Sequence, residues 1–158
     1  TLEAAGISLG CIIQKACTAE KLLIAITNRS LHLGNQINDP INKESYLFTR
    51  NLFCQKFQLS SLRRKHRLYI KRGNVNRRKL INEIEVIKLL EQYGFEPVVM
   101  DNKTVQEQAE LFLQAEAIVA LHGAALTNLL FIQPGTKVIE LAPLGYVNNC
   151  FYTLASHA

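Results

Sequence analysis

The stretch that decides the fold runs from Arg67 to Pro143 and reads RLYIKRGNVNRRKLINEIEVIKLLEQYGFEPVVMDNKTVQEQAELFLQAEAIVALHGAALTNLLFIQPGTKVIELAP. Four short, apolar runs alternate here with three segments of helical periodicity. The strand-like runs are Leu68–Lys71, Phe95–Met100, Ala117–Leu121 and Lys137–Leu141. Strands that alternate with helices of this length indicate a parallel sheet built from βαβ units. The predicted fold class is therefore α/β, with a doubly wound parallel sheet.

Three helices are expected between these strands. The first begins at Asn82, a common N-cap residue, and ends at Gly94. The second begins at Thr104, which forms a capping-box pattern with Glu107. The third is short and runs from Ala124 to Ile132. The expected buried residues are Val86, Leu89, Leu90 and Tyr93 on the first helix and Val105, Ala109, Phe112 and Ala115 on the second.

The flanking segments complete the expected domain organisation. Residues 1–30 read as the remnant of a preceding half, with joining strands at Cys11–Gln14 and Leu22–Ile26. Residues 31–158 form the main domain. It is expected to open with a helix over Lys43–Gln58, whose Tyr and Phe stripe faces the core, and to end with a helix over Tyr146–Ala158.

Composition narrows the class of protein. The 158 residues suffice for one α/β domain, and no apolar run approaches the ~20 residues of a membrane span. The four cysteines are scattered, which favours reduced thiols over a disulfide framework or a zinc site. A GxGxxG, GxxxxGK[ST], GxSxG or HExxH pattern is absent from the sequence. This argues against a dinucleotide oxidoreductase, a P-loop NTPase, an α/β-hydrolase and a dedicated metal site.

Positive charge is concentrated in one segment. The formal net charge is +5, and nine of the 18 Lys and Arg residues lie between Arg63 and Lys79, with no acidic residue among them. This run is either a solvated basic surface or a site for an anion, such as nucleotide phosphates, nucleic acid or an acidic glycan. Tyr69 is the one aromatic residue within the run, which weakens the nucleic-acid alternative.

The candidate site lies where the strands end, because ligands of open parallel sheets bind beyond the carboxyl ends of the strands. Those ends carry Lys71-Arg72, Asp101, His122-Gly123 and Ala142-Pro143. Arg72 suits a diphosphate, since a guanidinium forms paired, charge-assisted hydrogen bonds. Gly123 allows close approach of a ligand to the backbone at the start of a helix.

Two further residues leave alternatives open. His122 either donates to a phosphate or sugar hydroxyl or simply ends a strand; its position makes the two equal, and we expect its ring to be partly exposed at the strand edge. Glu140 lies in a strand that reads as buried, where a carboxylate is costly without partners. It is expected either to pair with an Arg or to accept hydrogen bonds from a ligand diol such as ribose.

The quoted stretch resembles the family 61 glycosyltransferases, which include bacterial capsular-polysaccharide proteins, plant xylan-decorating enzymes and EGF-domain O-GlcNAc transferases. The resemblance rests on a strand-end Arg, an Asn-Glu pair, HGAALTNLLF and PGTKVIEL taken together. It implies the C-terminal, donor-binding half of a GT-B-type enzyme with two Rossmann-like halves. It also implies inverting transfer from a nucleotide-sugar, UDP-linked by preference, to a glycan or protein hydroxyl, without a metal or other cofactor.

The resemblance also implies roles for particular residues. Arg72 would contact the diphosphate and His122 would be catalytic. The other donor-binding residues would be Asn82, Glu83, Gly123, Ala124, Asn128 and Glu140. The missing N-terminal half of the enzyme would be a partner in the reaction, so the fragment alone is expected to be inactive. The location implied is cytoplasmic for a bacterial protein, which is favoured, or the endoplasmic reticulum or Golgi lumen for a eukaryotic one. The alternative from another class is a non-enzymatic α/β module that binds nucleic acid or a polyanion.

Overall fold

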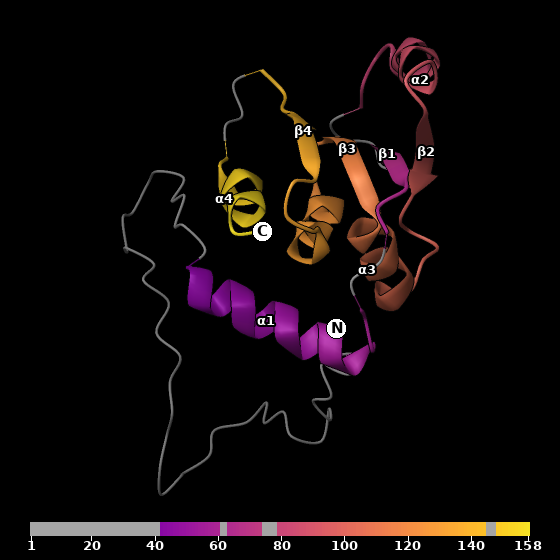
Figure 1. Cartoon of the computed structure of the whole chain (residues 1–158). Helices are drawn as coiled ribbons and strands as arrows, with labels where there is room; N and C mark the ends of the chain where they lie inside the picture. The colour runs from indigo at the N-terminus through magenta and orange to yellow at the C-terminus, as the bar shows by residue number, and fades with distance from the viewer. Residues whose placement is uncertain (1–41, 61–62, 74–78, 145–147) are drawn as a thin grey trace, which may run out of the picture.

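A computed structural model describes residues 42–60, 63–73, 79–144 and 148–158 (Figure 1). The predicted remnant of a preceding half over residues 1–30, with its two joining strands, lies outside these described residues. None of the helices within the described ranges is long and apolar enough to cross a membrane.

The centre of the fold is a four-stranded sheet in which every strand pair is parallel. The strands follow the order β2-β1-β3-β4. They are β1 (His66–Lys71), β2 (Phe95–Val99), β3 (Ala115–Leu121) and β4 (Lys137–Leu141). The predicted α/β class and parallel pairing are thus confirmed, with β1 and β3 each beginning two residues earlier than expected. The chain steps to opposite sides of β1 to form β2 and β3, so the topological switch point lies between β1 and β3.

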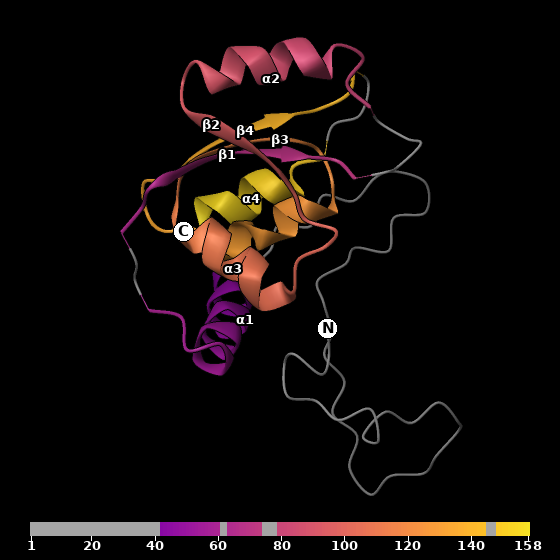
Figure 2. The ribbon, with the colours of Figure 1, turned by 90° about the vertical axis from the view of Figure 1, so that its right-hand side faces the viewer.

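Helices cover both faces of the sheet, as a doubly wound arrangement requires, but they cover them unequally (Figure 2). One face carries α2 (Glu83–Glu91) alone among the described elements. We call it the α2 face. The opposite face, here the packed face, carries α3 (Val105–Leu113), the 3₁₀ helix η2 (Ala124–Phe131), α4 (Cys150–Ser156) and α1 (Lys43–Lys56).

The hydrophobic core fills the packed face. Leu68 and Ile70 of β1 alternate onto this side together with Ile118 and Ala120 of β3, and all four are at most 3% exposed. Phe112 of α3, fully buried, packs against this layer. The remaining buried members of the cluster are Tyr46, Met100, Ala109, Ala115, Leu126, Leu129, Leu130, Phe131, Ile132 and Leu154.

Local sequence signals explain where several elements begin and end. Thr104 and Glu107 form the predicted capping box at α3: the Thr104 hydroxyl accepts from the Glu107 N–H, and the Glu107 carboxylate accepts from the Thr104 N–H at 2.6 Å. Asn42 caps α1 by accepting from the Ser45 N–H at 2.7 Å. Gly94 follows α2 with a φ of 76°, a left-handed conformation that glycine adopts without strain.

The expectations for α2 are partly wrong. Asn82 is at the N-cap position, but within the described residues its side chain does not cap the helix. The predicted apolar stripe is not a buried face either, because Leu89 is 52% and Tyr93 60% exposed. Helical periodicity identifies an amphipathic helix, but among the described elements the sheet alone lies beside α2, so Val86 and Leu90 are only partly buried and Leu89 stays exposed.

Other differences from the sequence predictions are smaller. Ala115 is buried, but as the first residue of β3 and not as part of α3. In α1, Tyr46 is buried as expected, whereas Phe48 is 71% exposed. The last described strand, β4, is an edge strand with Ile139 56% exposed, so the buried strand expected around Glu140 is wrong.

The basic run of the sequence is divided by β1. Arg63 and Arg64 precede the strand and Arg72 follows it, and six residues of strand separate the two groups by about 20 Å. Two cations of the run are engaged in the fold: Arg64, before the strand, donates to the Pro134 carbonyl at 3.1 Å, and Arg67, within the strand, pairs with Glu116 at 3.0 Å. The run is therefore not one continuous basic surface, and Arg77 and Arg78 lie outside the described residues.

Candidate functional site

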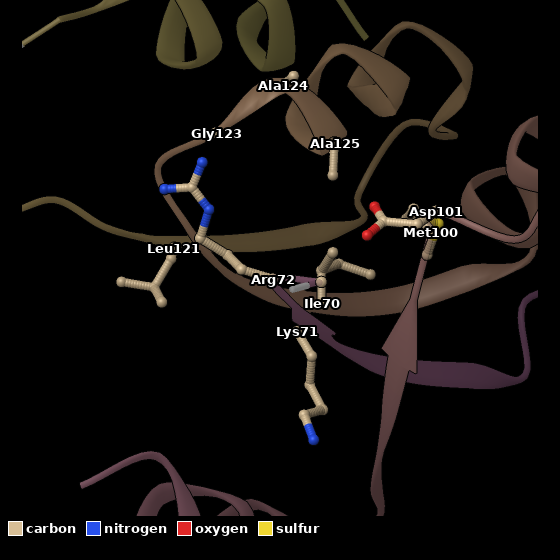
Figure 3. Close-up of a pocket in the computed structure, with 10 residues that line it drawn as sticks. Ile70, Lys71, Arg72, Met100, Asp101, Leu121, Gly123, Ala124 and Ala125 are labelled. Atoms are coloured by element: carbon tan, nitrogen blue, oxygen red, sulfur yellow. The ribbon is translucent and has the colours of Figure 1, made fainter. Parts of the chain in front are cut away.

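A pocket of about 170 Å³ opens at the carboxyl edge of the sheet (Figure 3). It is lined by the ends of β1, β2 and β3 and by Ala124 and Ala125, the first residues of η2. Its charged lining consists of Lys71, Arg72 and Asp101. The pocket lies at the β1/β3 switch point, where doubly wound sheets bind their ligands.

A second pocket, of about 200 Å³, lies next to the first. The two share Arg72, Gly73 and Leu121 as lining residues, and the second adds Lys79, Leu80 and Glu83 from the start of the α2 region. Arg72 therefore stands between two cavities, one towards β2 and η2 and one towards α2. An elongated ligand that fills both must pass this guanidinium.

Arg72 lies directly against Gly123 of the β3–η2 turn. A Cβ placed on Gly123 would lie 3.3 Å from Arg72 Nη2 and 3.4 Å from its Cζ. The φ of Gly123 is 177°, an extended value open to any residue, so the glycine is needed for space and not for conformation. The absence of a side chain lets the guanidinium lie beside the first turn of η2.

A second close approach to a glycine involves Asp101, which follows β2. A Cβ placed on Gly73 would lie only 1.5 Å from Asp101 Oδ2. The carboxylate therefore occupies the space that any larger residue at position 73 would need. Figure 3 shows Asp101 and Arg72 on the same side of the sheet edge, whereas Lys71 points away from both.

His122 is buried at the carboxyl end of β3. The residue is 5% exposed, so the predicted partial exposure of its ring is wrong. The ring Nδ1 pairs with Glu140 Oε1, and the ring centroid lies 5.0 Å from that of Phe151 of α4. The backbone N–H of His122 donates to the Leu141 carbonyl at 2.9 Å. The His122 ring is buried because α4 packs over it through Phe151. The strand pattern of the sequence does not predict where this helix packs.

Glu140 lies on the packed face of β4, two residues after Val138, which packs against the core cluster. The sequence left its partner open between an Arg and a ligand diol, but the partner seen here is the His122 imidazole. The Glu140 side chain is 21% exposed. Burial raises the pKa of the neighbouring Cys150 thiol, and the Glu140 carboxylate raises it further. Neither Glu140 nor His122 lines the two pockets described above.

Comparison with known proteins identifies the family. Residues 12–139, most of the chain, match the sequence pattern of the family described as Glycosyltransferase 61. The chain belongs to glycosyltransferase family 61. The predicted resemblance is therefore confirmed at the level of the family.

Similar members of glycosyltransferase family 61 come from plants. Xylan glycosyltransferase MUCI21 of Arabidopsis thaliana is 32% identical over 71 residues, which is 43% of this chain and 14% of the relative. Beta-1,2-xylosyltransferase XYXT1 of Oryza sativa subsp. japonica is 34% identical over 71 residues, 44% of this chain and 15% of the relative. Alpha-1,3-arabinosyltransferase XAT3 of the same rice is 34% identical over 82 residues, 49% of this chain and 14% of the relative. The chain thus matches about one seventh of the length of each relative.

The remaining candidates of this family 61 chain lie in different environments. Glu83 lines the second pocket and accepts a hydrogen bond from the buried Tyr69 hydroxyl at 3.0 Å. Asn82 is exposed and lines neither pocket. Asn128 is only 9% exposed, and its amide donates to Gln108 Oε1 at 2.8 Å and to the Ala125 carbonyl at 3.0 Å. Donor-binding roles for these three residues stay predictions.

Sequence reasoning did not select every residue at the site. The sequence pattern places Asp101 at a strand end without indicating a role, and Lys79 only within the basic run, whereas each lines a pocket. The signal for Asp101 was its position directly after an apolar strand. In the described ranges, no three His, Cys, Asp or Glu residues are grouped so that they could hold a metal ion.

Proposed function

We propose that this chain contributes the nucleotide-sugar donor site of a GT-B-type glycosyltransferase that acts in polysaccharide or glycoprotein glycan synthesis. Membership of family 61 supports the reaction class. The observation that carries the donor site is Arg72, which stands between two pockets at the switch point of a parallel sheet. The proposed ligand is a nucleoside diphosphate sugar whose diphosphate lies at Arg72.

The chemistry of the site suits a diphosphate. The Arg72 guanidinium stays ionised and offers paired donors to phosphate oxygens. Gly123 leaves room for that guanidinium beside η2, and Ala124 and Ala125 of the first turn line the same pocket. The first N–H groups of a helix have no acceptor within the helix and favour an anion. In an inverting transfer these groups would stabilise the leaving diphosphate without a metal.

The catalytic role of His122 stays a prediction in this scheme. Its ring is buried against Phe151 and bonded to Glu140, so the ring stabilises the β3–η2 turn that contains Gly123. A direct step on the acceptor hydroxyl would need the ring to become accessible when the N-terminal half of the enzyme closes over the site. The acceptor-binding site and the catalytic base are assigned to that N-terminal half.

The experiment compares two arginines of the basic run. Arg72→Ala should weaken UDP binding by about 1.5–3 kcal/mol, or roughly ten- to a hundred-fold, the range for hydrogen bonds to a charged group. Arg64→Ala removes the same charge at the opposite end of β1, where the side chain donates to Pro134, and should have little effect. Calorimetry or NMR titration with UDP, GDP, CDP and ADP measures both affinity and base preference.

Equal, small losses of UDP affinity in Arg72→Ala and Arg64→Ala would contradict a donor site at Arg72. They would mean that the ligand is attracted only by the general positive charge of the surface. A steep salt dependence with no preference for a nucleoside diphosphate over a polyanion would favour the non-enzymatic binding module. The chain alone should show no sustained release of nucleotide from nucleotide-sugars, because one half of the cleft leaves the bound donor open to water. Sustained turnover that is lost in Arg72→Ala would show that these 158 residues suffice.

A further inference from the structure

Asp101 lines the first pocket, and the turn that contains it is held by hydrogen bonds on both sides of the residue. Asp101 lies in the turn after β2, and Gly73 leaves the space that its Oδ2 occupies. The turn is tied by the Lys103 N–H, which donates to the Met100 carbonyl at 3.0 Å. The Gln108 amide of α3 donates to the Met100 carbonyl at 3.3 Å and to the Lys103 carbonyl at 2.9 Å.

A polar chain connects this turn to η2. Asn128 of η2 donates to Gln108 Oε1 at 2.8 Å, and the Gln108 amide donates in turn to the two carbonyls on either side of Asp101. Asn128 is 9% exposed and Gln108 is half-buried, so this link is partly shielded from solvent. The position of Asp101 is therefore fixed relative to the first turn of η2, the element beside which the Arg72 guanidinium lies.

An acidic residue in a diphosphate pocket needs a specific reason. A carboxylate repels phosphate oxygens, so Asp101 reduces the attraction of the pocket for a bare anion. A carboxylate is, however, an acceptor for hydroxyl groups, and two vicinal hydroxyls can donate to its two oxygens. In dinucleotide-binding sheets a carboxylate near the end of the second strand binds ribose in this way. Asp101 follows β2, the second strand described here.

We propose that Asp101 binds vicinal hydroxyl groups of the donor while Arg72 binds its diphosphate. This inference rests on the proposed function and adds the chemical feature that the first pocket selects. Both residues line one pocket, and a hydroxyl-bearing ring is attached at each end of the diphosphate of a nucleotide-sugar. The shared chemistry is the diol, which belongs to the ribose or to the transferred sugar. Asp101 thereby selects a glycosylated diphosphate over pyrophosphate.

The test uses Asp101→Asn in the 158-residue chain, with four ligands: pyrophosphate, UDP, 2′,3′-dideoxy-UDP and UDP-xylose. The wild-type chain should bind UDP about tenfold more tightly than dideoxy-UDP, the lower end of the range for a hydrogen bond to a charged acceptor. Asp101→Asn keeps one acceptor oxygen but loses the charge, so it should clearly reduce this preference and should bind pyrophosphate at least as well as the wild type. If Asp101→Asn binds UDP-xylose more weakly than the wild type does but binds UDP equally well, the diol belongs to the transferred sugar.

Two further variants separate this role from general charge and packing effects. Glu116→Gln makes the same change of charge at an exposed site paired with Arg67, and should change neither selectivity nor affinity. Gly73→Ala should displace the Asp101 carboxylate and reproduce the selectivity of Asp101→Asn while the aspartate remains in place. Circular dichroism checks that each variant is folded.

The outcomes distinguish the two proposals. If Arg72→Ala weakens UDP binding but Asp101→Asn and Gly73→Ala both keep the tenfold preference for UDP over dideoxy-UDP, the hydroxyl-binding role is wrong and the donor site stands. An equal loss of affinity for pyrophosphate and UDP in Asp101→Asn would also overturn the hydroxyl-binding role, because it would indicate that the substitution changes the whole pocket. If the wild-type chain binds none of the four ligands, the proposed function fails and this inference fails with it.

Discussion

The two faces of the sheet are built from the same strands but differ in how they are covered. On the packed face, Leu68, Ile118 and Phe112 are fully buried between the sheet and its helices. On the α2 face, Tyr69 is 1% exposed, whereas Ile139 in the same layer is 56% exposed. Because α2 is the one helix on that face within the described residues, burial there is limited to the central strands. The comparison shows that apolar periodicity reports burial only where a second layer exists.

The difference extends to polar side chains. The packed face contains a buried histidine, His122, whose partner Glu140 comes from the edge strand. The α2 face contains Tyr69, whose hydroxyl bonds Glu83 and so connects the sheet to α2. The His122–Glu140 pair thus stabilises the end of β3 next to η2, and the Tyr69–Glu83 pair fixes α2 on the opposite face.

The largest expected difference between the two faces is the loss of stability when an apolar side chain is truncated to alanine. Phe112→Ala should lower the free energy of unfolding by about 3–5 kcal/mol, because it leaves a cavity in a closely packed layer. Ile84→Ala on α2, where the side chain is 71% exposed, should change it by less than about 0.5 kcal/mol. Urea denaturation followed by circular dichroism measures both. Similar losses in the two variants would mean that the α2 face is packed in solution and that the comparison fails.

A smaller effect is expected for the buried pair on the packed face. Glu140→Ala leaves the His122 ring without its Nδ1 partner in a site that is only 5% exposed, and should cost about 1–3 kcal/mol of stability. Glu116→Ala, which removes an exposed carboxylate paired with Arg67, should cost clearly less. The same denaturation measurement compares the two. A Glu140 variant as stable as the Glu116 variant would return Glu140 to a ligand-binding role.

The smallest expected effect concerns the link to α2. Tyr69→Phe removes the hydrogen bond to Glu83 and should cost about 1 kcal/mol near neutral pH. Burial, reinforced by Glu83, raises the pKa of Tyr69 above its usual value. Since the folded chain holds this proton to higher pH than the unfolded chain, the contribution is intact below about pH 10 and is lost as the pH rises above that value.

The measurement is the difference in unfolding free energy between wild type and Tyr69→Phe from pH 7 to 11. The advantage of the wild type should shrink above about pH 10, because the variant has no phenol to titrate at this position. A difference that stays constant across the range would place the hydroxyl in solvent and remove the link between β1 and α2.

Sequence patterns are enough to predict the order and type of the elements between Lys43 and Ser156. Alternation of apolar runs with capped helices predicted a parallel sheet, and the Thr104 capping box and Gly94 marked helix ends that the structure reproduces. Position at strand ends predicted Arg72 at the carboxyl edge, because parallel strands end on the same side. These features depend on residues close in the chain, so local chemistry is enough to predict them.

The tertiary structure decided which side chains meet. Glu140 and His122 are 18 residues apart, and their pairing depends on β4 lying beside β3 and on α4 closing over the ring. Gly73 and Asp101 come together because β1 and β2 are neighbours, which no local pattern states. Contacts between residues distant in sequence are set by how layers pack and which strands adjoin. For that reason the sequence located the edge that holds the site, and the packing determined which residues face the pocket.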